Sequence, residues 1–170
     1  MREDLDFEFI IMDQEQYQIE VKDYLESISY LAICELSLFQ NYNFHPVVKL
    51  IDTEVFYGDL SEGLPIRIFL MDEHNCEVFH EDRNYFPHSS VGLLEYVKLP
   101  KWNVSTKLEN SMELETEIIV EWFIDCWQKS GGQSFELPAY ICQHDDVMSF
   151  NLKTLEWKNE KDDKWNYFTN

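Results

Sequence analysis

The most chemically suggestive stretch of the sequence is Cys142-Gln143-His144-Asp145-Asp146. A thiol, an imidazole and two carboxylates are groups that bind metal ions or transfer protons. A zinc site, however, needs three or four converging ligands, and no second pair of ligands follows at a suitable spacing. An aspartate-rich turn after a strand, with the thiol of Cys142 pointing inward, explains the same residues. We therefore predict neither a catalytic nor a metal-binding residue here, and keep an enzyme that uses this region as an alternative.

A looser cluster contains His74, Cys76 and His80. On a strand these side chains would share one face, but a turn expected near Asn75 breaks that geometry. Cys126 falls on the apolar face of an expected helix, where thiols usually pack without reacting. The sequence also lacks G-x-S-x-G, H-E-x-x-H and a glycine-rich phosphate loop, and it contains five glycines in all. These features predict a protein that is not an enzyme and binds no cofactor.

A row of acids offers a different kind of chemistry. Glu113, Glu117, Glu121 and Asp125 recur at every fourth position, a spacing that places side chains on one face of a helix. Like charges four residues apart destabilise a helix by about 0.2–0.5 kcal/mol per pair, and no lysine or arginine lies within the row. The simpler interpretation is a solvated helix face; the alternative is a docking surface for a basic partner. These four residues, here called the acidic row, are the predicted partner-binding residues.

The helix that would carry the acidic row is the best-defined element of the sequence. Its apolar positions also follow helical spacing: Leu114, Ile118, Ile119, Trp122, Phe123, Cys126 and Trp127. Asn110 and Glu113 fit a capping arrangement at its start, and Gly131-Gly132 fits its end. We predict one long amphipathic helix over about residues 111–130, packed on a sheet.

The remaining elements are predicted to be mainly strands. Tyr17, Ile19 and Val21 alternate with polar residues, which indicates a strand. Residues 25–39 fit both a strand and a helix; their Ile, Tyr and Ser content and the lack of good helix caps favour the strand. Further strands are expected at 6–11, 47–57, 66–70, 76–80 and 139–143, turns at 13–16, 58–63 and 73–75, a loop at 131–134, and a hairpin over 148–158.

These elements together predict the fold class. It is α+β, with a mostly antiparallel meander in the N-terminal half, one long helix and a C-terminal β-hairpin. Residues 81–108 are expected to be largely irregular, with a short strand or helical turn near 91–98. At 170 residues, the chain is expected to form one globular domain.

Composition restricts the function further. A net charge of −20 disfavours phosphate backbones and anionic membranes, so we expect neither nucleic-acid nor membrane binding. The 45% hydrophobic and 15% aromatic content argues against disorder. No stretch approaches the ~20 apolar residues of a membrane span, and no secretory signal is visible, which predicts a cytoplasmic protein. The four scattered cysteines are expected to be reduced, packed thiols.

No family motif is recognisable, so three functions are weighed. The first is an acidic soluble binding protein, such as an inhibitor or immunity-type protein, that engages a basic protein. The second is an enzyme that depends on a metal or small molecule and uses the region from Cys142 to Asp146. The third is a structural or adaptor module whose charge serves solubility. The sequence leaves the oligomeric state open.

Overall fold

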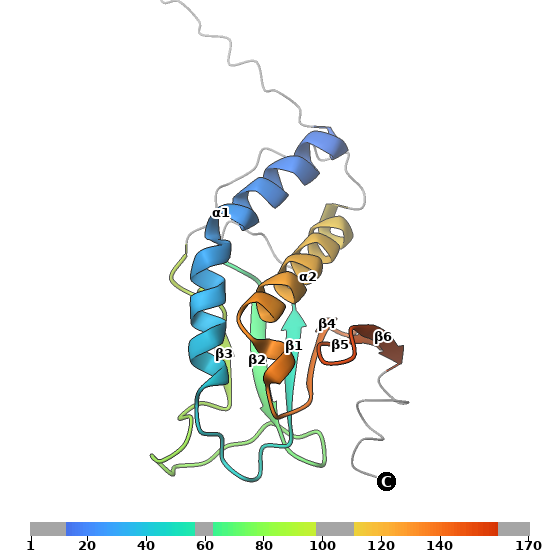
Figure 1. The fold of residues 1–170 in the computed structure, drawn as a ribbon. Helices are drawn as coiled ribbons and strands as arrows, with labels where there is room; N and C mark the ends of the chain where they lie inside the picture. Colours follow the sequence, from blue (N-terminus) through green and yellow to red (C-terminus); the bar gives the residue numbers. More distant parts are fainter. Residues whose placement is uncertain (1–12, 57–62, 98–110, 160–170) are drawn as a thin grey trace, which may run out of the picture.

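Two helices lie on one face of a mixed β-sheet (Figure 1). The computed structural model describes residues 13–56, 63–97 and 111–159. The elements in chain order are α1 (Gln14–Gln40), β1 (Leu50–Val55), β2 (Ile66–Met71), β3 (Ser90–Gly92), α2 (Ser111–Lys129), the 3₁₀ turn η2 (Gly132–Ser134), β4 (Ala139–Gln143), β5 (Met148–Asn151) and β6 (Glu156–Asn159).

The sheet has six strands in the order β3-β2-β1-β4-β5-β6. β1 pairs with β4 in parallel, with Ile51 opposite Ala139, whereas the other neighbouring strands are antiparallel. The chain crosses from β3 to β4 by way of α2, which packs against β1 and β4. β1, β2 and β3 pair antiparallel in chain order, but a long helix precedes them and the whole sheet is mixed, so the predicted fold class is wrong in its layout.

The largest correction concerns α1, a 27-residue helix where two strands are predicted. Its buried residues are Tyr17, Val21, Leu25, Ile28, Ser29, Ala32, Leu36 and Phe39. Their spacing of three and four residues is that of one helix face. Asp13 caps the helix, because its side chain accepts a hydrogen bond from the Gln16 amide at 2.8 Å. The predicted turn at 13–16 is thus the start of a helix.

α1 bends about midway along its length (Figure 1). Two serines in this helix donate hydrogen bonds to carbonyls of the preceding turn: Ser27 to Tyr24 at 2.6 Å and Ser29 to Leu25 at 3.0 Å. Such bonds compete with the regular helical ladder and often bend a helix. The bend allows both halves of α1 to follow the sheet and α2.

α2 confirms the predicted amphipathic helix, over Ser111–Lys129. The predicted cap at Asn110 lies outside the described residues. Gly131 takes a left-handed conformation after the helix, with φ of 99°. Gly132 packs against the indole of Trp127 so closely that a Cβ atom would overlap the ring. Glycine is therefore required at 132 by space and favoured at 131 by backbone conformation.

Three polar contacts join α1 to α2 across a shared apolar core. The Tyr17 hydroxyl donates to buried Glu115, and the Trp122 indole N–H donates to the Ser29 hydroxyl at 2.8 Å. Near the other end, Gln40 donates to the Ser130 hydroxyl at 2.8 Å. These contacts fix the register of the two helices while the apolar residues between them supply most of the burial.

The other predicted elements can be compared directly. β1, β2, β4 and the β5–β6 hairpin confirm the strands expected at 47–57, 66–70, 139–143 and 148–158. The turn near Asn75 is also confirmed, since Asn75 has φ of 58°. Residues 76–80 form a single bridge, between Glu77 and Met71, instead of a strand. β3 falls close to the short strand expected near 91–98, and the loop expected at 131–134 contains η2.

Some predictions fall where the structure gives no description. These are the strand at 6–11 and most of the turn at 58–63. No helix within the described ranges is both long enough and apolar enough to cross a membrane.

Candidate functional site

The acidic row lies on the solvent side of α2. All four of its residues are exposed, whereas the opposite face of the helix contributes Ile119, Phe123, Cys126 and Trp127 to the core. The separation follows from sequence spacing, because charged side chains at every fourth position cannot rotate into the core without burying charge. Glu115, outside the row, is the exception: it is buried and accepts the Tyr17 hydrogen bond.

One member of the acidic row has an internal partner. Lys129 Nζ lies 2.6 Å from the Asp125 carboxylate, one helical turn away. This hydrogen bond raises the pKa of Lys129 above its ordinary value. The expectation that no basic side chain offsets the repulsion within the acidic row is therefore wrong at Asp125. No ion pair found among the described residues involves Glu113, Glu117 or Glu121.

The acidic surface continues from α2 onto α1. A groove of about 350 Å³ between the two helices is lined by Glu121 and Asp125 on one side and by Asp23 and Glu26 on the other. Among the described residues that line this groove, Lys22 is the one cation. The sequence pattern does not reveal these α1 acids, because it predicts strands at residues 16–22 and 25–39 and no helix beside α2.

A pocket lies on the other side of the row, between α2 and the C-terminal hairpin; we call it the hairpin pocket. Its volume is about 460 Å³, and its lining residues are Thr116, Glu117, Val120, Glu121, Ile124, Gln143, Asp146, Phe150 and Trp157. Phe150 and Trp157 are cross-strand partners whose rings meet edge to face, with centroids 5.5 Å apart. Trp157 is 50% exposed. The pocket thus combines two members of the acidic row with an accessible aromatic ring.

The stretch from Cys142 to Asp146 forms the end of β4 and the turn into β5. Cys142 is buried and the two aspartates lie at a turn after the strand, as expected. The Nδ1 atom of His144 lies 2.6 Å from Glu54 Oε2, and the ring of Phe56 packs on the imidazole with centroids 4.4 Å apart. The hydrogen bond with Glu54 raises the pKa of His144 above its ordinary value.

Glu54 is the residue that sequence reasoning missed at this position. It lies 90 residues before His144, and the parallel register places it opposite Cys142. Only the pairing of β1 with β4 brings a thiol, an imidazole and a carboxylate to one end of the sheet. No local pattern in the sequence signals that pairing.

The cluster of His74, Cys76 and His80 is divided by a turn. Asp72 Oδ1 accepts hydrogen bonds from the amides of His74 and Cys76 at 2.8 and 2.9 Å. His80 instead stacks on His45, with ring centroids 4.8 Å apart. Within the described ranges, no group of three or more His, Cys, Asp or Glu residues is arranged to hold a metal ion.

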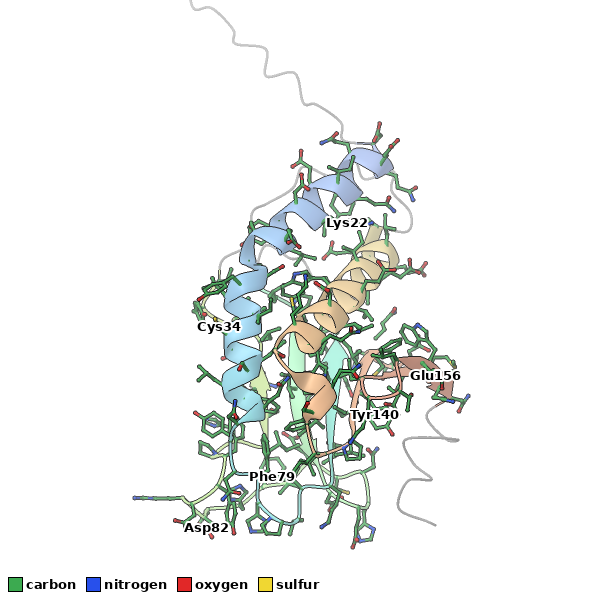
Figure 2. All side chains as sticks on the ribbon, viewed as in Figure 1. Lys22, Cys34, Phe79, Asp82, Tyr140 and Glu156 are labelled. Atoms are coloured by element: carbon green, nitrogen blue, oxygen red, sulfur yellow. The ribbon has the colours of Figure 1, made fainter. Side chains whose placement is uncertain are left out.

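The cysteines differ in exposure. Cys126 and Cys142 are buried, whereas Cys34 and Cys76 are exposed, so the expectation of packed thiols holds for two of the four. Figure 2 shows Cys34 on the side of α1 that faces away from α2. Burial raises the pKa of Cys126 to about 11, which removes its thiolate at neutral pH.

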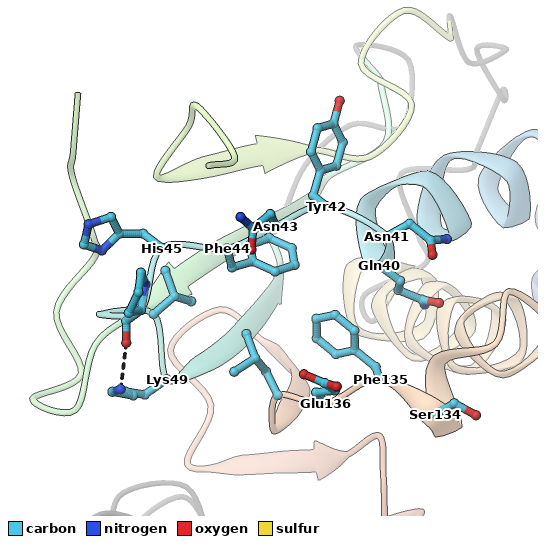
Figure 3. A pocket seen from close by; sticks show the side chains of 13 residues that line it. Gln40, Asn41, Tyr42, Asn43, Phe44, His45, Lys49, Ser134, Phe135 and Glu136 are labelled. Carbon is cyan, nitrogen blue, oxygen red and sulfur yellow. Dashed lines mark hydrogen bonds between the residues drawn. The ribbon is translucent and has the colours of Figure 1, made fainter. Parts of the chain in front are cut away.

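A further pocket lies where α1 leads into β1 (Figure 3). It has a volume of about 540 Å³ and is lined largely by side-chain amides and aromatic rings from residues 40–49 and 134–137. The Lys49 ammonium points to the Pro46 carbonyl, to which it donates at 2.7 Å. With Glu136 on the opposite wall, the pocket contains both charges but no cluster of reactive groups.

Comparison with known proteins gives one weak similarity. The chain is 25% identical over 115 residues to a glutamyl-tRNA reductase of Listeria welshimeri, which covers 64% of this chain. The aligned part is 25% of the reductase, so the chain spans about a quarter of that protein's length. No family model matches the chain, and no solved structure matches it. The similarity does not show a family.

Proposed function

We propose that this chain is an acidic binding protein, of the inhibitor or immunity type, whose acidic row docks on a basic protein. The observation that carries the proposal is the exposure of Glu113, Glu117 and Glu121 on one rigid helix with no ion pair among the described residues. A row of unrelieved like charges destabilises the free helix slightly, and an opposing basic surface would remove that repulsion.

The surroundings of the row support the same proposal. Asp23 and Glu26 on α1 and Asp146 beside the hairpin extend the negative surface on both sides of α2. A net charge of −20 adds a long-range field that attracts cations. Such a field accelerates encounter with a basic partner and repels the phosphate backbone of nucleic acids.

The test compares two variants that each lose four negative charges. The row variant carries Glu113→Gln, Glu117→Gln, Glu121→Gln and Asp125→Asn. The control variant carries Gln at Glu15, Glu73, Glu81 and Glu136, which are exposed and lie outside the row. Partners are captured from native extract at low salt, and their association rates are then measured for each variant.

The row variant is expected to associate at least about 10-fold more slowly than wild type at low salt, because steering charges act mainly on the on-rate. The control variant has the same net charge as the row variant, and its association rate should fall much less. Equal on-rates for the two variants, or an on-rate that salt does not change, would contradict the proposal.

A second candidate function is favoured by the contact between His144 and Glu54. A carboxylate that orients an imidazole is a common arrangement for proton transfer, and Cys142, on β4, lies opposite Glu54. As the alternative, we propose an enzyme that depends on a metal or small molecule and uses the region from Cys142 to Asp146. The check is metal content in protein purified without chelator, followed by ligand binding of His144→Ala. Absence of bound metal, together with no ligand whose affinity the substitution alters, would remove the alternative.

A further inference from the structure

The hairpin pocket has two walls of different chemistry. α2 contributes Glu117 and Glu121 together with the apolar side chains of Val120 and Ile124. The β5–β6 hairpin contributes Phe150 and the half-exposed Trp157. A lining that combines carboxylates, apolar side chains and an accessible aromatic ring suits a side chain that has both an apolar stem and a charged head.

The charges of the pocket select the sign of its occupant. Among the residues that the structure describes, three carboxylates line it, those of Glu117, Glu121 and Asp146, and no lysine or arginine does. Lys158, which follows Trp157 on β6, is not a lining residue and pairs with Glu156 at 2.9 Å. Asp146 has one oxygen occupied, since its Oδ1 accepts the Met148 amide at 3.0 Å. The pocket is therefore complementary to a cation.

Trp157 narrows the choice among cations. Its ring is half-exposed on β6, at the end of the described sheet, where a large aromatic residue gains little from the core. Exposed tryptophans are enriched among the residues that dominate protein interfaces. A planar guanidinium stacks on an indole face and also forms paired hydrogen bonds with carboxylates, whereas an ammonium does so less well.

We propose that the hairpin pocket receives one arginine side chain of the partner, with its guanidinium stacked on Trp157 and bound by Glu117 and Glu121. This inference rests on the proposed function and specifies its anchor. In this arrangement the acidic row governs the rate of encounter, and the buried arginine governs how long the complex lasts.

The direct test uses short peptides and needs no partner. A capped tripeptide with arginine between two glycines is titrated into the full chain, alongside versions with lysine and with citrulline, the neutral isostere of arginine. The signals followed by NMR are the indole N–H of Trp157 and the side-chain amide of Gln143, which also lines the pocket. Variants are Trp157→Ala, Glu117→Gln with Glu121→Gln, and, as a charge-matched control on two exposed residues outside the pocket, Glu73→Gln with Glu81→Gln.

The arginine peptide is expected to shift both signals saturably, and the citrulline peptide is not. Trp157→Ala, followed through Gln143, should weaken arginine binding by roughly 3- to 10-fold, the range of a cation–π contact. Glu117→Gln with Glu121→Gln should weaken it similarly, and Glu73→Gln with Glu81→Gln should leave it unchanged. Equal binding of citrulline, equal binding of lysine, or an unaltered affinity in Trp157→Ala would overturn the inference.

The two proposals fail in different ways. With a captured partner, Trp157→Ala should raise the dissociation rate and leave the association rate unchanged, the reverse of the row variant. If the row variant loses association but Trp157→Ala dissociates as wild type does, the arginine anchor is wrong and the docking surface remains. If the arginine peptide binds as expected but no partner distinguishes the row variant from its control, the proposed function is wrong.

Discussion

His144 and Glu54 are the clearest case of a residue pair whose behaviour should depend on pH. The carboxylate of Glu54 raises the pKa of His144, with Asp145 contributing less. The folded pKa therefore lies above the unfolded value of about 6.5, and the folded state binds the proton more tightly. The stabilisation is fully present below the unfolded pKa and is lost as the pH rises through the folded pKa.

Replacing the partner should reverse this shift. We expect Glu54→Gln to lower the pKa of His144, measured by NMR titration of its ring protons, and to reduce the extra stability seen below pH ~6.5. Asp145→Asn serves as the matched control, since Asp145 lies 3.5 Å from the other ring nitrogen and is exposed. If the pKa of His144 falls further in Asp145→Asn than in Glu54→Gln, the hydrogen bond with Glu54 is not the main cause of the raised pKa.

The sequence predicted part of the candidate site at this scale. The acidic row is a local pattern, so helical spacing alone placed Glu117 and Glu121 on the exposed face of α2. Asp146 and Trp157 belong to the same pocket only because a hairpin folds beside α2. Their proximity depends on tertiary packing, which no spacing in the sequence records.

At the scale of elements, the contact between α1 and α2 can be tested through one hydroxyl. Ser29 is buried and accepts the Trp122 indole N–H at 2.8 Å. Ser29→Ala leaves that donor without an acceptor, and we expect the free energy of unfolding to fall by about 1–3 kcal/mol. Urea denaturation followed by tryptophan fluorescence measures the change.

Ser27 provides the control for this prediction. It is exposed on the same helix, and its hydroxyl contacts only the carbonyl of Tyr24 among the described hydrogen bonds. Ser27→Ala should alter the free energy of unfolding by less than about 0.5 kcal/mol. Equal losses in the two variants would mean that the bond to Trp122 adds nothing to the packing of the helices.

α1 was predicted as strands because apolar residues also occupy its solvent side. Ile19, Tyr30 and Leu38 are 45%, 75% and 69% exposed, and they create the alternation that resembles a strand. The buried residues alone have a helical period, but burial is not visible in the sequence. The polar residues 13–16 predict a turn, whereas Asp13 caps the helix.

The parallel pairing of β1 and β4 was missed for a different reason. Each strand was located from its own composition, but consecutive strands were joined by default as antiparallel neighbours. Paired residues of β1 and β4, such as Ile51 and Ala139, are 88 positions apart in the chain. Only the position of α2 on the sheet allows such a crossover connection.

For the whole molecule, the charge predicts a stability that rises with salt. At a net charge of −20, the negative side chains repel one another, and the repulsion is stronger in the compact folded state than in the unfolded chain. Raising the NaCl concentration from about 20 to about 200 mM shortens the screening length from roughly 20 to roughly 7 Å. We expect Tm, measured by differential scanning calorimetry, to increase by at least about 2 °C.

The four-charge variants extend this test. Both should melt at a higher temperature than wild type at low salt, and both should respond less to added salt, because less repulsion remains to be screened. A Tm that does not change with salt in any of the three proteins would show that the surface charges are too widely spaced to repel one another.

The contacts between α1 and α2 also determine how long α1 stays uncovered during synthesis of the chain. Those made by Tyr17, Ser29 and Gln40 span 98, 93 and 90 residues. At a synthesis rate of about 5–20 residues per second, α1 waits roughly 5–20 s for the helix that covers it. During that interval its apolar stripe is open to chaperones and to other nascent chains. Stalling the ribosome between the two helices should therefore cause more aggregation of this protein than stalling it after α2.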